Sequence, residues 1–217
     1  MNIAVLVSGG GTNLQAIIDQ IDNQALRDVA IVTIISSSHN AFALERAKKH
    51  AIPSCVVAKK DYPDFNAYDE AMMQALSDER IELVVLAGFL SLLGPKVVRK
   101  FSNRIINIHP SLIPSFCGHG MYGIKPHEAA LARGVKVSGA TVHFVNEHYD
   151  EGPILLQKCT QVLREDTPQS LQLRIMKECE QVILPRAIQL IADHQVNIED
   201  NRAYISSNCT GKREGQQ

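Results

Sequence analysis

Asn107 and His109 are the two polar residues in the otherwise apolar run from Ile105 to Pro110. Because side chains alternate between the faces of a strand, both should point to one face, opposite the neighbouring isoleucines. A histidine at the carboxyl end of a strand can act as a general acid or base, and an asparagine amide can donate to a developing oxyanion. The residues also leave open a hydrogen-bonded core histidine beside a capping asparagine.

Two carboxylates, Asp150 and Glu151, stand in a turn that ends with Gly152 and Pro153. An opposite charge at close range raises the pKa of a histidine by about one to three units. If one of these carboxylates lies beside His109, we expect a raised His109 pKa and a charged imidazolium, suited to proton delivery near neutral pH. A surface turn without function is the alternative.

A glycine-rich segment, Ser8 to Asn13, follows an apolar run and precedes residues with helical spacing. Backbone amides at a helix N-terminus, together with the helix dipole, can bind a phosphate. The segment has neither the spacing of the dinucleotide-binding fingerprint nor the Gly-Lys-Ser/Thr ending of a nucleoside-triphosphate loop, so a single phosphate monoester is the better ligand. The alternative is a tight turn in which Thr12 or Asn13 caps the helix.

Other reactive residue types carry weaker signals. His143 stands within a strand-like run and favours a structural histidine, whereas His119 stands in a loop where it could contact a ligand. Cys117 has no neighbour in the sequence that marks it as an activated nucleophile. Lys177 and Glu180 are three residues apart on a predicted helix, where a solvated ion pair is the ordinary interpretation.

The elements that must position these residues alternate between strand and helix. Such alternation is typical of an α/β fold with a doubly wound, mostly parallel, Rossmann-like sheet. The later strands predict a C-terminal antiparallel extension, followed by a long C-terminal helix. The expected strands are 2–7, 29–35, 53–57, 81–87, 105–108, 140–145 and 154–157, and the expected helices begin near residue 14 and cover 42–50, 67–76, 127–133 and about 168–192.

Composition limits the classes of partner. The net charge of -1, without a dense basic run, gives no footprint for nucleic acid or an anionic membrane, so small-molecule substrates are expected. Five widely spaced cysteines without a C-x-x-C pair indicate free thiols and no zinc centre. The sequence shows no signal-peptide pattern or membrane-length apolar stretch, which predicts a cytoplasmic location.

The chain is long enough for one sizeable core, so we expect a single domain over residues 1–206 and a disordered tail over 207–217. The sequence does not distinguish a monomer from a homodimer. The loop from Pro110 to Pro126 is long, and long loops in compact domains are often functional, although the sequence does not give the role of residues 115–125.

Five motifs occur in a characteristic order along the chain. They are Ser8-Gly-Gly-Gly-Thr-Asn13, Leu86-Ala-Gly-Phe-Leu90, Asn107-Ile-His-Pro-Ser-Leu-Ile-Pro114, Ser138-Gly-Ala-Thr-Val-His143 and Asp150-Glu-Gly-Pro153. The ordered set, from Asn2 to about Tyr204, strongly resembles the phosphoribosylglycinamide formyltransferases, a family of folate-dependent formyltransferases. The resemblance implies formyl transfer from 10-formyltetrahydrofolate to the amine of 5-phosphoribosylglycinamide in purine synthesis, without a metal.

The resemblance also implies roles for particular residues. Asn107, His109 and Asp150 would be catalytic, with protonated His109 stabilising a tetrahedral intermediate and moving protons. The implied contacts with phosphoribosylglycinamide are Gly10, Gly11, Thr12, Asn13, Lys177 and Glu180, and those with folate are Phe65, Leu90, Ser91, Leu92, Leu93 and Asn107.

Two departures from the family pattern stand out. Phe65 and Ser91 occupy positions where some relatives have arginine near the folate, which leaves the contacts of the folate tail open. The loop from Phe116 to Tyr122 also differs from the proline-glycine version of other relatives.

Other readings share part of the pattern. A methionyl-tRNA or sugar-amine formyltransferase and a formyltetrahydrofolate hydrolase would use the same chemistry. A tRNA enzyme is expected to add a C-terminal RNA-binding domain, and a hydrolase an N-terminal regulatory domain, for which this length leaves no room. A phosphate-ligand sensor without catalysis would keep the glycine loop, but would have no reason to pair Asn107 with His109 opposite an acid.

Overall fold

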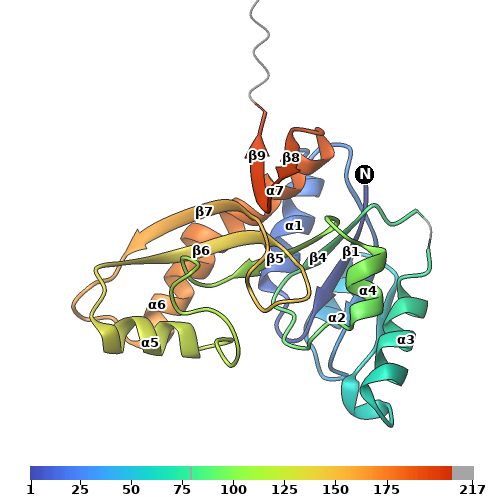
Figure 1. Ribbon diagram of the computed structural model, residues 1–217, viewed down its shortest axis with the longest axis horizontal. Coiled ribbons are helices and arrows are strands. Elements are labelled where there is room, and N and C mark those ends of the chain that lie inside the picture. Colours follow the sequence, from blue (N-terminus) through green and yellow to red (C-terminus); the bar gives the residue numbers. More distant parts are fainter. Residues whose placement is uncertain (79, 207–217) are drawn as a thin grey trace, which may run out of the picture.

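A seven-stranded sheet runs through the protein, which we describe from a computed structural model covering residues 1–78 and 80–206 (Figure 1). The strand order is β3-β2-β1-β4-β5-β6-β7. The strands are β1 (Asn2–Val7), β2 (Ala30–Ser36), β3 (Ser54–Val56), β4 (Leu83–Leu86), β5 (Ile105–His109), β6 (Val137–Phe144) and β7 (Ile154–Gln161). The predicted tail over 207–217 lies outside the described residues.

The first five strands pair in parallel, and β6 and β7 are added antiparallel beside β5. The central strands β1 and β4 are covered on both faces and therefore consist almost wholly of aliphatic residues. The predicted α/β class, the mostly parallel sheet and the antiparallel extension are confirmed.

Helices cover both faces of the sheet. The α-helices are α1 (Thr12–Asp22), α2 (Ala43–Lys49), α3 (Phe65–Ala75), α4 (Pro95–Lys100), α5 (Lys125–Arg133), α6 (Pro168–Ile175) and α7 (Gln181–Ala192), and a 3-10 turn covers Lys59–Asp61. One apolar core lies between the sheet and α1, α2, α5, α6 and α7, and the other lies between the sheet and α3 and α4. Both faces of the central strands are therefore buried.

The C-terminal helical region differs from the single long helix that the sequence predicts. A π-helical turn, Met176–Glu180, separates α6 from α7, and the amide of Gln181 bonds to the carbonyl of Met176, five residues back. Such turns occur within α-helices often at functional sites. Apolar periodicity does not register one extra residue in a turn, which is why the sequence did not indicate it.

Three short elements were not predicted. The helix α4 has six residues and begins with Pro95. Strands β8 (Val196–Glu199) and β9 (Arg202–Ile205) form a separate hairpin beside α7, at the top of Figure 1. Elements this short carry too few apolar positions to show a periodicity.

The sheet topology creates a natural binding position. The chain passes from β1 outward to β2 and β3, and then returns to the other side of β1 as β4 and β5. Ligands of open α/β sheets bind beyond the carboxyl ends of strands at such a switch point. The loops after β1, β4 and β5 meet there. Within the described ranges, no helix has the length and apolar character needed to cross a bilayer.

Candidate active site

A cavity of about 860 Å³ opens at this switch point. Its walls come from the glycine loop, from the segments after β4 and β5, from the loops 118–125 and 145–150, and from the π-helical turn. Most of the residues assigned from the sequence line it: Gly10, Gly11, Thr12, Asn13, Phe65, Leu90, Ser91, Leu92, Leu93, Asn107, His109, Asp150 and Glu180.

Asn107 is anchored across the sheet by His143. The two residues are register partners on β5 and β6, and the Asn107 amide Nδ2 donates to His143 Nε2 over 3.2 Å. His143 Nδ1 in turn donates to the Phe144 carbonyl over 2.9 Å. Since a carbonyl only accepts, Nδ1 carries the ring proton, and Nε2 is free to accept from Asn107. One N–H of the Asn107 amide therefore stays available for a ligand.

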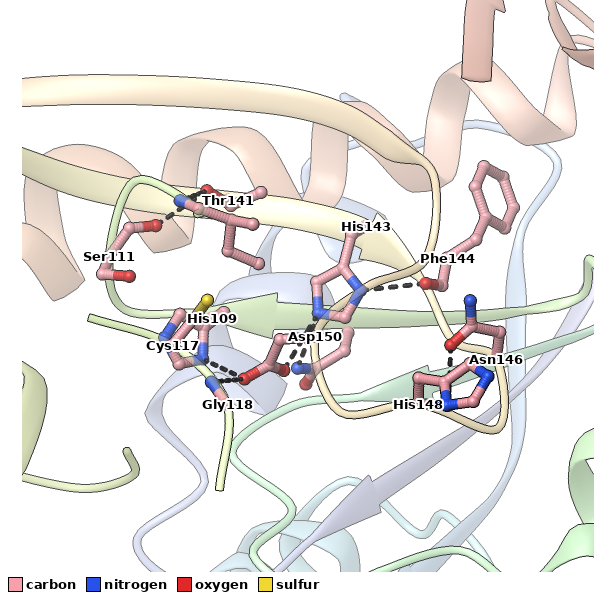
Figure 2. A network of polar contacts seen from close by, with 12 residues as sticks. His109, Ser111, Cys117, Gly118, Thr141, His143, Phe144, Asn146, His148 and Asp150 are labelled. Atoms are coloured by element: carbon pink, nitrogen blue, oxygen red, sulfur yellow. Dashed lines mark hydrogen bonds and ion pairs between the residues drawn. The ribbon is translucent and has the colours of Figure 1, made fainter. Parts of the chain in front are cut away.

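His109 is only 4% exposed and is held by the loop that follows β5. Its Nε2 donates to the carbonyl of Phe116 over 3.0 Å. Its Nδ1 lies 3.6 Å from Asp150 Oδ2, as Figure 2 shows for the two side chains. The proton of a neutral His109 is thus on Nε2, because Phe116 offers only an acceptor. Nδ1 is the nitrogen that can take up a further proton, and it would do so beside a carboxylate.

The pKa of His109 corrects the sequence-based expectation. Burial lowers it, and this effect outweighs the raising effects of the Asp150 charge and the Phe116 carbonyl, while His143 lowers it further. The predicted raised pKa and resting imidazolium are therefore wrong for the free protein. His109 rests neutral near pH 7, and Asp150 limits the depression of its pKa.

Asp150 lies between the two histidines, as Figure 2 shows. Its Oδ1 is 3.5 Å from His143 Nε2, and its Oδ2 accepts the Gly118 amide over 2.8 Å. Burial alone would raise the pKa of Asp150, but the contacts with His143, His109 and Gly118 together lower it. The carboxylate is thus ionised at neutral pH. Gly152 permits this turn, because a Cβ there would overlap the Phe144 carbonyl.

The glycine loop presents an uncapped helix start to the cavity. Gly11 is the N-cap residue of α1, with φ of 67°, and no side chain bonds to the first amides of the helix. The alternative reading, with Thr12 or Asn13 as the cap, is therefore wrong. Ser8 Oγ accepts the Leu90 amide over 2.7 Å and ties this loop to the segment after β4.

Glu180 closes the cavity behind the glycine loop. It is 8% exposed and accepts a hydrogen bond from Asn13 Nδ2 over 2.7 Å, so it is not the solvated ion-pair partner of Lys177. Burial raises the pKa of Glu180, although Asn13 opposes this effect. The Oδ1 atom of Asn13 is buried without a protein partner. Lys177 is exposed and does not line the cavity, so the structure brings only Glu180 to the site.

The opposite end of the cavity is apolar. Leu90 and Leu92 leave 56% and 45% of their surface exposed, whereas Leu93 is buried against the second core. Phe65, at the start of α3, also lines this end. Exposed leucines gathered at a concave surface are typical of a site for a flat, largely apolar ligand.

The sequence matches a known family over most of its length. The model described as formyl transferase matches residues 1–188, most of the chain and all the residues of the cavity. The chain belongs to the formyl transferase family. The resemblance seen in the motifs is therefore confirmed.

Curated relatives agree with this assignment. The chain is 36% identical over 210 residues to phosphoribosylglycinamide formyltransferase of Haemophilus influenzae, covering 97% of this chain and 96% of that protein. It is 41% identical over 199 residues to the trifunctional purine biosynthetic protein adenosine-3 of Bos taurus, covering 92% of this chain but 19% of that protein. This formyl transferase thus spans about a fifth of the trifunctional relative.

Solved structures share the fold over nearly the whole chain. Glycinamide ribonucleotide transformylase 1 of Symbiobacterium toebii matches with a TM-score of 0.89 at 40% identity, covering 95% of this chain and 94% of that one. A formyltetrahydrofolate deformylase of Pseudomonas syringae matches with a TM-score of 0.84 at 27% identity, covering 95% of this chain and 66% of that one.

The loop 115–125 of this formyl transferase forms one wall of the cavity. His119 packs edge-on against Tyr149, with 5.8 Å between the ring centroids, and so joins this loop to the loop that carries Asp150. Burial raises the pKa of the Cys117 thiol, and the nearby Asp150 charge raises it further. The interpretation of Cys117 as an unactivated thiol is confirmed. Cys55, Cys117, Cys159 and Cys179 are free thiols.

Two further histidines lie near the catalytic cluster or within the core beside it. The sequence favours a structural role for His143, and the structure places it in contact with both Asn107 and Asp150. The contact follows from the pairing of β5 with β6, which puts His143 directly opposite Asn107. The alternation within β6 alone does not show this pairing. His127, on α5, is fully buried with neither ring nitrogen bonded to protein, and no sequence signal marked it. Across 1–78 and 80–206, no three potential ligand side chains gather in a metal-binding arrangement.

His127 should make the formyl transferase sensitive to acid. Burial, with a smaller effect of His109, lowers its pKa from 6.5 to about 4. Between these values the unfolded chain binds a proton that the folded chain does not, so the free energy of unfolding falls as the pH falls, by about 3 kcal/mol at most. Urea unfolding at pH 7 and pH 4.5 measures this effect. Between the two pH values, the free energy of unfolding should fall less in His127→Gln than in wild type.

The exposed His194 provides the matched control. In His194→Gln the free energy of unfolding should fall between pH 7 and pH 4.5 by as much as in wild type. An equal fall of the unfolding free energy in His127→Gln and wild type would contradict the assignment of the acid sensitivity to His127.

Proposed function

We propose that the protein transfers the formyl group of 10-formyltetrahydrofolate to the amine of 5-phosphoribosylglycinamide, a step of purine synthesis in the cytoplasm. The observation that carries the proposal is that one cavity joins the glycine loop, the cluster of Asn107, His109 and Asp150, and the apolar segment 90–93. The names of the similar Haemophilus influenzae and Symbiobacterium toebii proteins support formyl transfer to this ribonucleotide.

The phosphorylated substrate fits the end of the cavity at the glycine loop. The uncapped amides of α1 suit a phosphate, which also favours the positive end of the helix dipole. Glu180 and the unpartnered Oδ1 of Asn13 are acceptors on the same side, suited to N–H and hydroxyl groups of a ribosyl glycinamide. The substrate amine would then lie toward the catalytic cluster.

The folate fits the apolar end. Leu90, Leu92 and Phe65 offer surface to a flat ring system, and the backbone of segment 90–93 offers hydrogen bonds to its edge. Ser91 and Phe65 offer no positive charge to an acidic folate tail. We therefore expect the tail to contribute little to binding.

Neutral His109 suits the first proton transfer. As the amine nitrogen bonds to the formyl carbon, His109 Nδ1 accepts one proton from that nitrogen, and the imidazolium forms beside the Asp150 carboxylate. His109 then donates this proton to N10 of the folate as the bond between the formyl carbon and N10 breaks. The net reaction moves the formyl group from N10 to the amine and one proton from the amine to N10.

Asn107 suits stabilisation of the tetrahedral intermediate. Its second amide N–H is available to the oxyanion, because the first is held by His143. The new positive charge on His109 adds to this stabilisation. Asp150 touches neither reacting atom in this scheme; its carboxylate balances the charge of the His109 imidazolium.

The test is the absorbance change of 10-formyltetrahydrofolate with and without phosphoribosylglycinamide, combined with detection of formate. We expect turnover that requires the ribonucleotide and yields no formate. Folate turnover with formate release and no need for the ribonucleotide would instead indicate a deformylase, as in the similar Pseudomonas syringae protein. Ligand binding without turnover would favour a sensor and overturn the proposal.

A further inference from the structure

The glycine loop is held in one orientation by bonds to its carbonyls. Gly9 O accepts the amide of Ala43 over 3.1 Å, and Gly11 O accepts the amide of Gln15 over 2.9 Å. Between them, Gly10 O accepts Nε of Arg46 over 2.8 Å. Three successive carbonyls of the loop are thus bound to donors on α1 and α2.

This arrangement determines where the loop amides point. In a trans peptide the N–H points away from the C=O of the preceding residue. Since Ala43, Gln15 and Arg46 do not line the cavity, the three carbonyls turn from it, and the amides of residues 10, 11 and 12 turn toward it. The loop is therefore prepared for an anion before any ligand arrives.

Arg46 is the side chain in this set, and it is fixed at several points. Its Nη1 donates to Gln15 Oε1 over 2.9 Å, and its guanidinium lies 5.1 Å from the centre of the Phe42 ring. Gly11 packs directly on this element, since a Cβ there would come within 2.8 Å of the Ala43 side chain and 3.3 Å of Arg46 Cδ. The planar guanidinium thus joins α2, α1 and the loop.

The charge of Arg46 also matters at this end of the cavity. Among the described residues that line the cavity, Lys125 is the single lysine or arginine, against Glu147, Asp150 and Glu180. A dianionic phosphate would meet a wall that is negative on balance. A cation bonded to the Gly10 carbonyl polarises that peptide group and strengthens its N–H, the amide of Gly11, as a donor to an anion.

We propose that Arg46 is a positioning residue for the phosphate of the substrate: it fixes the Gly10 carbonyl away from the cavity and places a positive charge one peptide unit behind the amides that bind the anion. This inference rests on the proposed function, because it takes the phosphate to lie at the glycine loop. Arg46 acts through the loop and does not touch the substrate.

The variants separate charge, hydrogen bonding and packing. Arg46→Met keeps an apolar stem of similar length but loses the charge and both bonds, and Arg46→Lys keeps the charge but cannot make both bonds. Arg99→Met removes an exposed arginine on α4, on the other side of the sheet, and is the matched control. Thermal unfolding of each variant shows whether it folds.

The decisive measurement uses two substrates, phosphoribosylglycinamide and its dephosphorylated riboside. For Arg46→Met we expect KM for the ribonucleotide to rise by about 10- to 100-fold, with kcat and KM for the folate nearly unchanged. The kcat/KM for the riboside should stay at the wild-type value. Arg46→Lys should be intermediate, and Arg99→Met should match the wild type.

Inorganic phosphate gives a readout that needs no turnover. Phosphate should raise the unfolding temperature of wild type and Arg99→Met, and this increase should be much smaller in Arg46→Met. Ligand-induced stabilisation reports binding to the folded state directly.

The possible failures are distinguishable. Equal losses with ribonucleotide and riboside would show that Arg46 only supports the structure, and an unchanged KM for the ribonucleotide would show that the loop does not need it; both overturn the inference but leave the proposed reaction intact. A wild-type protein that does not distinguish the two substrates would overturn the phosphate site itself, and the inference with it.

Discussion

His109→Asn is expected to lower kcat for formyl transfer by about three orders of magnitude, the middle of the range for loss of a positioned acid and base. Asparagine keeps an amide at the reach of the ring Nδ1 but is too short to replace the Nε2 donor to the Phe116 carbonyl. It cannot carry a proton from the amine to N10. Steady-state kinetics with both substrates at saturation measure this loss as a change in kcat.

The same substitution at an exposed histidine provides the control. His194→Asn, at the end of α7 and remote from the cavity lining, should keep the wild-type kcat. Binding of the folate to His109→Asn, measured by calorimetry, should stay within a few fold of wild type, because His109 is assigned to proton transfer. A kcat for His109→Asn within tenfold of wild type would contradict that assignment.

Most of the sheet could be predicted from the sequence because its strands are buried on both faces. Residues such as Val84 and Val85 on β4 read as a continuous apolar run, and the intervening segments carry helical spacing. The glycine segment after β1 and the alternation of Asn107 with His109 on β5 identified two parts of the site. Both features are local in sequence, so no knowledge of distant contacts was needed.

The remaining features depend on distant contacts. The contact of His143 with Asn107 exists because β6 pairs with β5 in one register, which the pattern of either strand alone does not fix. The direction of the His109 pKa depends on how much burial outweighs the Asp150 charge. The sequence suggests the charge but not the degree of burial. Likewise, Glu180 bonds to Asn13 of α1, a partner that its spacing from Lys177 does not indicate.

Asp150→Asn is expected to lower kcat by about three orders of magnitude and to shift the acid side of the pH profile. The imidazolium of His109 would form without its counter-charge, which raises the energy of every state that carries it. Because Asp150 raises the pKa of His109 against the effect of burial, its removal should lower this pKa further. The kcat/KM of wild type should rise with pH through a pKa below 6.5, the ordinary value for histidine.

The direction of this shift separates the role given to Asp150 from a purely structural one. In Asp150→Asn the rise of kcat/KM should occur at lower pH than in wild type, although the activity at the plateau is far smaller. Glu151→Gln removes the adjacent, exposed carboxylate and should leave both the plateau and the acid side unchanged. If the plateau of kcat/KM falls but the pH at which kcat/KM rises does not change, Asp150 only supports its turn through the Gly118 amide. A shift to higher pH would mean that the neutral state of His109 does not control the acid side of the profile.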